Sequence, residues 1–232
     1  MNAFQLKLLA LVLMLGDHIH YLFLFQDPQP PAWLTWLGRL SAPIFVFLMV
    51  ESFQHTKNRA AYRDRLLWGA VVMISGTVLL HSLYPRADGL LLTNNIFLTL
   101  GWGILLLEKL CVYLERQRPL DSFYFAVLLL VGCLFTEGGI LLLPLTLLFY
   151  VFRAKPKWLI TGYLFFCLSM IPGSWPFFSA DPHNNVQWMM LFALPFFFLY
   201  NGKRGPHCRW LFYVFYPLHL WLLYLISAYL QK

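Results

Sequence analysis

Charged residues are scarce in this chain. Asp, Glu, Lys and Arg together make up 12% of its 232 residues, against about 25% in soluble domains. Hydrophobic residues make up 60% and aromatic residues 19%, and the apolar residues come in runs of roughly 15 to 22 instead of short amphipathic patterns. A soluble core of this size could not bury them all. The composition excludes a soluble enzyme and a disordered tail, and it predicts an all-α protein that crosses a membrane several times.

Paired cysteines and the common catalytic motifs are absent. The chain has four cysteines, Cys111, Cys133, Cys167 and Cys208. They lie far apart without CxxC spacing, so they indicate buried thiols rather than a disulfide or zinc framework. There is no Walker loop, GxGxxG, HExxH or GxSxG motif. A removable signal peptide is not indicated either, because the first apolar run, from Leu8 to Phe25, is longer than the usual apolar region of about 7 to 15 residues.

Nine segments are predicted to span the membrane as helices, since a helix needs about 20 apolar residues to cross the hydrocarbon core. They are residues 4–25, 32–53, 66–84, 92–114, 121–136, 138–153, 157–172, 186–200 and 209–230. Only a short turn around Glu137 separates the fifth from the sixth, so eight or ten spans are the alternatives. We expect residues 1–232 to form a single transmembrane domain, a polytopic helical bundle.

Positive charge is distributed unevenly along the chain. Of the 17 Lys and Arg residues, all but Arg39, Arg86 and Lys232 fall near the N-terminus or in alternate connections between the predicted spans. In membrane proteins such residues collect in cytoplasmic loops. The excess over the 10 acidic residues therefore reports topology rather than nucleic-acid binding. It places the N-terminus in the cytoplasm and the C-terminus outside, and it favours an odd number of spans.

Polar residues near the ends of the predicted spans gather on the extracytoplasmic side. They are Asp17, His18, His20, Arg39, His81, Asn94, Asn95, Glu137, His183, Asn184 and Asn185. Ionisable groups within a membrane rarely face lipid, and they commonly mark functional sites. We therefore expect these side chains to line a cavity that opens to the extracytoplasmic side.

One face of the first predicted helix combines a cation and an imidazole. Lys7 and His18 are eleven residues apart, which returns the helix to within about 20° of the same direction after a rise of about 16 Å. This predicts Lys7 near an anionic donor at the cytoplasmic end and His18 as a general base at the other end. Asp17 points about 100° away, so it would orient His18 only indirectly. His18 and His20 point to nearly opposite faces, which argues against a metal site.

Each of these candidates also has a structural interpretation. Lys7 could snorkel to the membrane interface, and His18 could be a hydrogen-bonded structural residue. Glu51 and His55 either form an intrahelical pair or contribute to a cytoplasmic cofactor entrance. The basic segment that follows either binds phosphates or marks topology and contacts lipid headgroups. Its cations are Lys57, Arg59, Arg63 and Arg65.

Several segments together resemble the TraX family of bacterial membrane proteins. They are LKLLALVLMLGDHIHYLF (6–23), GRLSAPIFVFLMVESFQHTKNRAAYRDRLL (38–67), NNIFLTLGWG (94–103), LFALPFFFLYNGKRG (191–205) and FYVFYPLHLWLLYL (212–225). The family is named for a conjugation protein that resembles an N-acetyltransferase of pilin. The Lys7 to His18 spacing and the terminal FYVFYPLHL, with its His219, also resemble a wider class of membrane acyltransferases. Where relatives carry an Asp-Tyr-Gly turn, this chain has Glu137-Gly138-Gly139.

The resemblance implies an acetyltransferase of the bacterial inner (cytoplasmic) membrane. It would move an acetyl group from cytoplasmic acetyl-CoA to an extracytoplasmic pilin amine or envelope glycan, with no metal. The expected catalytic residues are His18, Asp17, Asn94, Asn95 and Arg39. The residues expected to bind acetyl-CoA are Lys7, Glu51, Lys57, Arg59, Arg63 and Arg65. Three further residues are expected to line the cavity, namely His81, Glu137 and His219. His18 would deprotonate the acceptor or carry the acetyl group itself. Two alternatives stay open: a proton-coupled transporter with His18, His81 and Glu137 as a relay, and a non-catalytic envelope assembly factor.

Overall fold

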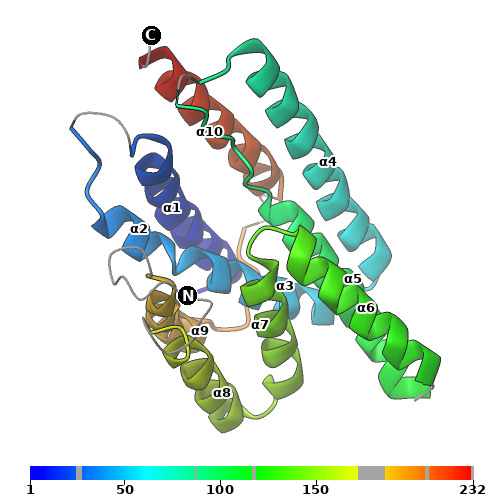
Figure 1. The fold of residues 1–232 in the computed structure, drawn as a ribbon. Coiled ribbons are helices and arrows are strands. Elements are labelled where there is room, and N and C mark those ends of the chain that lie inside the picture. Colours follow the sequence, from blue (N-terminus) through cyan, green and yellow to red (C-terminus); the bar gives the residue numbers. More distant parts are fainter. Residues whose placement is uncertain (25–27, 87, 117–118, 172–185, 207–208, 231–232) are drawn as a thin grey trace. The chain divides into compact units, whose positions relative to one another are not determined.

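The computed structural model describes residues 1–232 except 25–27, 87, 117–118, 172–185, 207–208 and 231–232 (Figure 1). All regular secondary structure in these described residues is helical. The elements are α1 (Ala3–Leu22), α2 (Trp33–Gly38), α3 (Ser41–His55), α4 (Arg59–Leu83), α5 (Ile96–Arg116), α6 (Pro119–Phe135), α7 (Gly139–Phe152), α8 (Pro156–Leu168), the 3-10 helix η1 (Gln187–Ala193), α9 (Leu194–Leu199) and α10 (Arg209–Leu230).

Each predicted span overlaps one or two helices; the second overlaps α2 and α3, and the eighth contains η1 and α9. Five stretches are long and apolar enough to cross a membrane, namely Ala3–Leu22, Trp33–His55, Arg59–Leu83, Ile96–Glu115 and Trp210–Leu230, and shorter apolar helices cover Leu120–Phe135, Gly139–Phe152 and Gln187–Leu199. The prediction of an all-α, multi-pass membrane protein is therefore confirmed. The number of nine spans, the orientation and the single domain stay predictions.

Side-chain caps move two helix starts away from the predicted bounds. The third predicted span begins seven residues early as α4, because the side chain of Asn58 accepts a hydrogen bond from the Ala61 amide at 2.9 Å and caps the basic first turn. The fourth begins four residues late as α5, where the Asn95 side chain accepts from the Leu98 amide at 3.2 Å. Hydropathy alone does not detect such caps.

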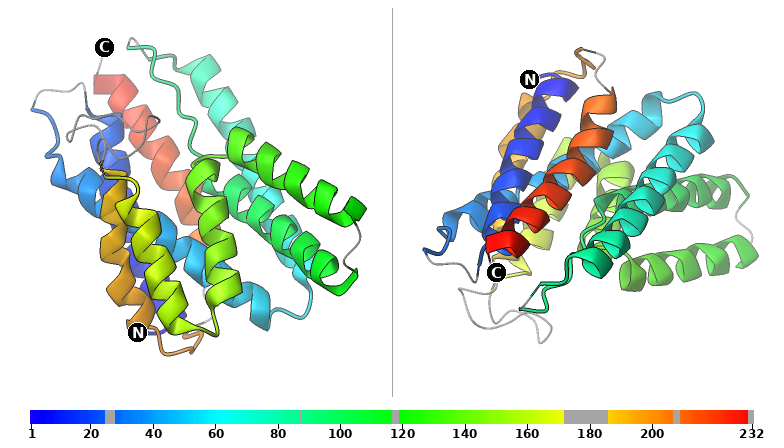
Figure 2. Two further views of the ribbon diagram at one scale, coloured as in Figure 1. Left: turned by 60° about the horizontal axis from the view of Figure 1, so that its bottom comes forward. Right: turned by 90° about the horizontal axis from the view of Figure 1, so that it is seen from above.

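The chain forms two compact units, residues 1–48 with 152–232, and residues 49–151. In the first unit, α1 and α10 lie side by side and run in the same direction (Figure 2). Near their starts the Phe4 and Phe212 rings lie 6.0 Å apart. The Ala3 amide donates to the Lys203 carbonyl at 2.8 Å, which fixes the N-terminus to the segment before α10. If the first and last spans are parallel, the number of crossings must be odd, in line with the charge pattern.

In the second unit, α4 packs on α5 and α5 packs on α6. The turn between α6 and α7 depends on Gly138, whose φ of 60° lies in the left-handed region that side chains avoid. The Trp102 indole on α5 donates to the Leu128 carbonyl of α6 at 2.9 Å. These contacts hold the α6–α7 turn close to the start of α5, where two of the predicted site residues lie.

Candidate functional site

Two buried histidines from opposite ends of the chain meet in the first unit. His18 of α1 and His219 of α10 are 5% and 6% exposed. Nδ1 of His18 lies 2.8 Å from Nε2 of His219, and the two imidazole rings are within 21° of parallel. Nδ1 of His219 lies 2.7 Å from the main-chain carbonyl oxygen of Phe215. The imidazoles thus form a hydrogen-bonded chain that ends on the backbone of α10.

Aromatic side chains of α10 hold this histidine pair from two sides. The Phe215 ring stacks on His219 with centroids 4.8 Å apart. The buried Tyr216 ring makes edge contacts with both imidazoles, at 6.3 Å from His18 and 5.8 Å from His219. Sequence reasoning missed Tyr216 as a neighbour of the pair. Its position three residues before His219, on the same helix face, is the signal that could have indicated it.

The Asp17 carboxylate forms an ion pair with Arg39. Its Oδ1 accepts from an Arg39 terminal nitrogen at 2.8 Å, and the two side chains are only 20% and 26% exposed. Asp17 packs directly against Gly38, because a Cβ added there would lie 2.7 Å from Cγ of Asp17. Arg39 is near enough to interact electrostatically with His18, and within the described part of the chain its buried Nε has no hydrogen-bond partner.

The other α1 candidates have separate surroundings. Lys7 lies with Nζ 5.4 Å from the Phe212 ring centroid on α10, so Lys7 and His18 both face α10, as their eleven-residue spacing predicts. His20 instead has Nδ1 3.0 Å from the carbonyl oxygen of Pro30. The two neighbouring histidines therefore have different partners, in agreement with their predicted opposite directions.

Asn94, Asn95 and Glu137 come together in the second unit. The Glu137 carboxylate accepts from Asn94 Nδ2 at 2.8 Å and from the Asn95 main-chain amide. The Glu137 carbonyl accepts from the Thr99 hydroxyl at 2.7 Å, and Asn95 Nδ2 donates to the Ala70 carbonyl at 3.1 Å. The bonds to Glu137 tie the α6–α7 turn to the start of α5, and the Asn95 side chain adds a bond to α4. Nε2 of His81, the remaining candidate of this group, accepts from the Leu92 amide at 2.9 Å.

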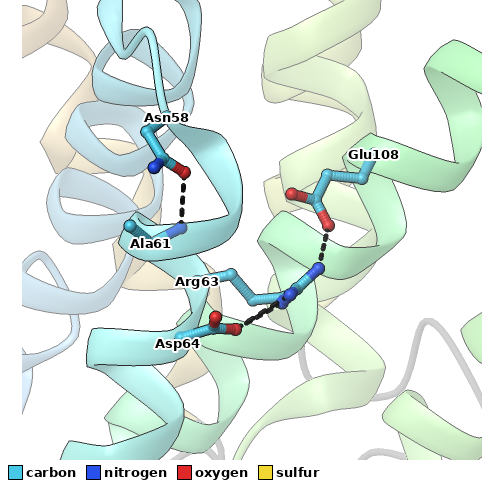
Figure 3. Close-up of polar contacts among 5 residues, drawn as sticks. All are labelled: Asn58, Ala61, Arg63, Asp64 and Glu108. Carbon is cyan, nitrogen blue, oxygen red and sulfur yellow. Dashed lines mark hydrogen bonds and ion pairs between the residues drawn. The ribbon is translucent and has the colours of Figure 1, made fainter.

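In the basic segment, Arg59 and Arg63 lie against other side chains, and the two remaining cations are exposed. Arg63 of α4 contacts Asp64 at 2.8 Å and Glu108 of α5 at 2.5 Å (Figure 3). The Arg59 guanidinium lies over the Phe53 ring at 4.3 Å. Lys57 and Arg65 are exposed. Glu108 was not among the predicted residues, although its place on an otherwise apolar helix marks it.

Two further expectations concern Glu51 and the extracytoplasmic loop. His55 does bond within α3, but Nδ1 lies 2.8 Å from the Glu51 main-chain carbonyl oxygen.

His183, Asn184 and Asn185 lie outside the described residues, as does Cys208. Among the residues that are described, no group of three or more His, Cys, Asp or Glu could hold a metal ion.

Comparison with known proteins decides the family. The sequence model described as "TraX protein" matches residues 3–227, nearly the whole chain. The chain belongs to the TraX family. It is also 29% identical, over 240 residues, to a protein of Dichelobacter nodosus named "Probable fimbrial assembly protein FimC, serogroup H1", with 99% of this chain and 97% of that protein covered. No solved structure matches. The resemblance inferred from the sequence is therefore confirmed at the level of family, while the roles of individual residues stay predictions.

Proposed function

We propose that this protein is a multi-pass acetyltransferase of the bacterial inner membrane that acts in pilus assembly. It takes an acetyl group from cytoplasmic acetyl-CoA and transfers it to a pilin amine on the extracytoplasmic side. The observation that carries this proposal is the buried His18–His219 pair, and Arg39 is near enough to interact electrostatically with His18. An imidazole within a membrane span is rare and commonly functional, and here it has a hydrogen-bonded partner that orients it.

The chemistry requires one base and one stabiliser of negative charge. The acceptor nitrogen attacks the thioester carbonyl, so that a C–N bond forms and the C–S bond to CoA breaks. His18 takes the proton lost by the amine and returns it to the departing CoA sulfur, which leaves as the thiol. Arg39 carries positive charge close to His18 and has a buried N–H without a partner among the described residues. It is the natural group to stabilise the oxyanion formed during attack.

The donor is expected to approach from the basic, cytoplasmic side. Lys57 and Arg65 are exposed, so they are the cations best able to bind the phosphates of CoA. Arg63 already has two carboxylate partners, which makes it a support for this segment rather than the first contact. Lys7, on the same face of α1 as His18, would meet the donor further along.

Pilin is favoured as the acceptor by the relative's name. A protein that matches this chain over nearly its full length is named as a fimbrial assembly protein, so a pilin amine is the acceptor that fits both that name and the proposed base. An envelope glycan hydroxyl is the other acceptor that the same base could serve. Both classes fit a base on the extracytoplasmic half of α1.

The test is acetyl transfer by the purified protein in lipid nanodiscs. Radiolabelled acetyl-CoA is supplied with a synthetic peptide that has a free N-terminal amine, and with the same peptide blocked at that amine. We expect label on the free peptide alone, together with release of CoA. His18→Ala should abolish transfer, while the matched control His20→Ala, which removes the neighbouring histidine on α1, should retain it.

Other outcomes would point to the remaining functions. Full transfer by His18→Ala would refute the proposed mechanism. Uptake of solutes or protons by proteoliposomes without acetyl-CoA would favour a transporter. Pilus assembly in cells that is unaffected by His18→Ala would favour a non-catalytic assembly factor.

A further inference from the structure

We propose that His219 is a positioning residue that fixes the tautomer of His18 and leaves Nε2 of His18 as the reactive nitrogen. This inference rests on the proposed function for its catalytic consequence. Its structural content, the position of one proton, stands by itself. It also gives His219 a specific role, whereas the sequence predicts only that His219 lines a cavity.

The positions of the protons follow from the end of the hydrogen-bond chain. A main-chain carbonyl can only accept, so Nδ1 of His219 must carry the hydrogen in its 2.7 Å contact with Phe215. In a neutral imidazole the other nitrogen is then an acceptor. Nε2 of His219 therefore accepts from Nδ1–H of His18 across 2.8 Å. With its hydrogen on Nδ1, neutral His18 has its lone pair on Nε2.

The burial of both histidines strengthens this assignment of the tautomers. Both histidines are at most 6% exposed, so water does not readily replace either partner, and a buried polar group without a partner costs about 1–3 kcal/mol. The near-parallel rings place the two nitrogens in line for a hydrogen bond. Phe215 and Tyr216 restrict rotation of the His219 ring. The opposite tautomer of His18 would set two lone pairs against each other.

The arrangement also suits the charge that develops during transfer. When Nε2 of His18 takes a proton from the acceptor, His18 becomes an imidazolium that still donates Nδ1–H to His219. A hydrogen bond from a charged donor is about twice as strong as one between neutral groups. His219 thus stabilises the protonated base without contacting either substrate. An orienting partner on the second nitrogen is a recurring feature of catalytic histidines.

The direct test is nitrogen NMR of the full chain in nanodiscs, with the histidines labelled with ¹⁵N. His18→Ala identifies the His18 signals by their loss. We expect a protonated Nδ1 and an unprotonated Nε2 for His18, and a scalar coupling across the Nδ1–H···Nε2 bond to His219. A His18 that carries its hydrogen on Nε2 would overturn the inference. This measurement does not require any acetyl transfer.

Two variants test the consequence for catalysis. His219→Gln keeps an amide oxygen close to the position of Nε2, and His219→Leu removes the acceptor at similar volume. We expect the leucine variant to lose about 100-fold or more in kcat with an unchanged KM for acetyl-CoA, by analogy with loss of the orienting partner in other histidine catalysts. The glutamine variant should stay within about tenfold of the wild type.

The two proposals fail in different ways. If the wild type transfers no acetyl group yet shows the Nδ1–H tautomer with its coupling, the proposed function is wrong and the positioning of His18 stands. If His18→Ala abolishes transfer but His219→Leu keeps full activity, the function stands and the positioning role is wrong. If His219→Leu does not fold, the wild-type spectrum still decides the tautomer.

Discussion

The ion pair between Asp17 and Arg39 should contribute measurably to stability, and a double-mutant cycle can determine how much. The two side chains are 20% and 26% exposed and their charged atoms lie 2.8 Å apart. Two unit charges about 4 Å apart attract by about 4 kcal/mol at an effective dielectric of about 20. The cycle cancels the desolvation cost of each single charge, but partial exposure to water and side-chain ordering reduce the attraction to about half of that value. We therefore expect a coupling energy of about 2 kcal/mol.

The cycle consists of Asp17→Asn, Arg39→Gln and the double variant, with the free energy of unfolding measured in mixed detergent micelles. The control is the Arg63–Asp64 pair of α4. It has the same 2.8 Å separation, but its carboxylate is 53% exposed. Exposed pairs contribute about 0.2–1 kcal/mol. We expect the control coupling to lie in that range and to fall as salt is added, while the Asp17–Arg39 coupling changes little.

A coupling for Asp17 and Arg39 no larger than that of the control pair would refute this reasoning. It would mean that water screens the pair in spite of its burial. Water would then reach the surroundings of the neighbouring His18 more than its burial indicates. The proposal that Arg39 stabilises an oxyanion strongly would be weakened as well.

Two further predictions concern packing and topology. Gly38→Ala should lower the free energy of unfolding by about 1–3 kcal/mol, because its Cβ would overlap Asp17. In the control Gly16→Ala the nearest atom to the new Cβ is the flexible end of Leu34, at 3.1 Å, so this variant should be near neutral in the same unfolding assay. Equal effects of the two substitutions would contradict the packing argument. On a cysteine-free background, a membrane-impermeant thiol reagent applied to intact spheroplasts should label Pro85→Cys but not Lys203→Cys; labelling of both, or the reverse pattern, would contradict the orientation drawn from the charges.

The helical segments were predictable because their physical cause is local. Apolar runs of sufficient length must be helical in lipid, since no water satisfies the backbone there. Their ends were less predictable, because they depend on single caps such as Asn58 and Asn95. The nine expected segments therefore matched helices, while the starts of α4 and α5 differed by several residues.

The sequence predicted several of the residues that come together, but it did not predict which side chains they contact. Helical spacing alone directed Lys7 and His18 to one face, and both contact α10. Spacing could not show that Asp17 pairs with Arg39, since that contact depends on how α2 packs against α1. Nor could it show that Asn94 and Asn95 bond to Glu137. These bonds anchor the α6–α7 turn, and a catalytic role for the two residues stays a prediction.

The pairing of His18 with His219 connects the topology to the chemistry. The two residues are 201 positions apart, and their helices run in the same direction from one end of the first unit. The segment from Asn201 to Arg204 holds the first residues of the chain through backbone hydrogen bonds, so that α1 and α10 begin together. A shift of α10 by one turn, about 5.4 Å, would break a 2.8 Å bond between the imidazoles. The N-terminal contacts therefore set the register on which the tautomer of His18 depends, even though they lie at the opposite end of α1.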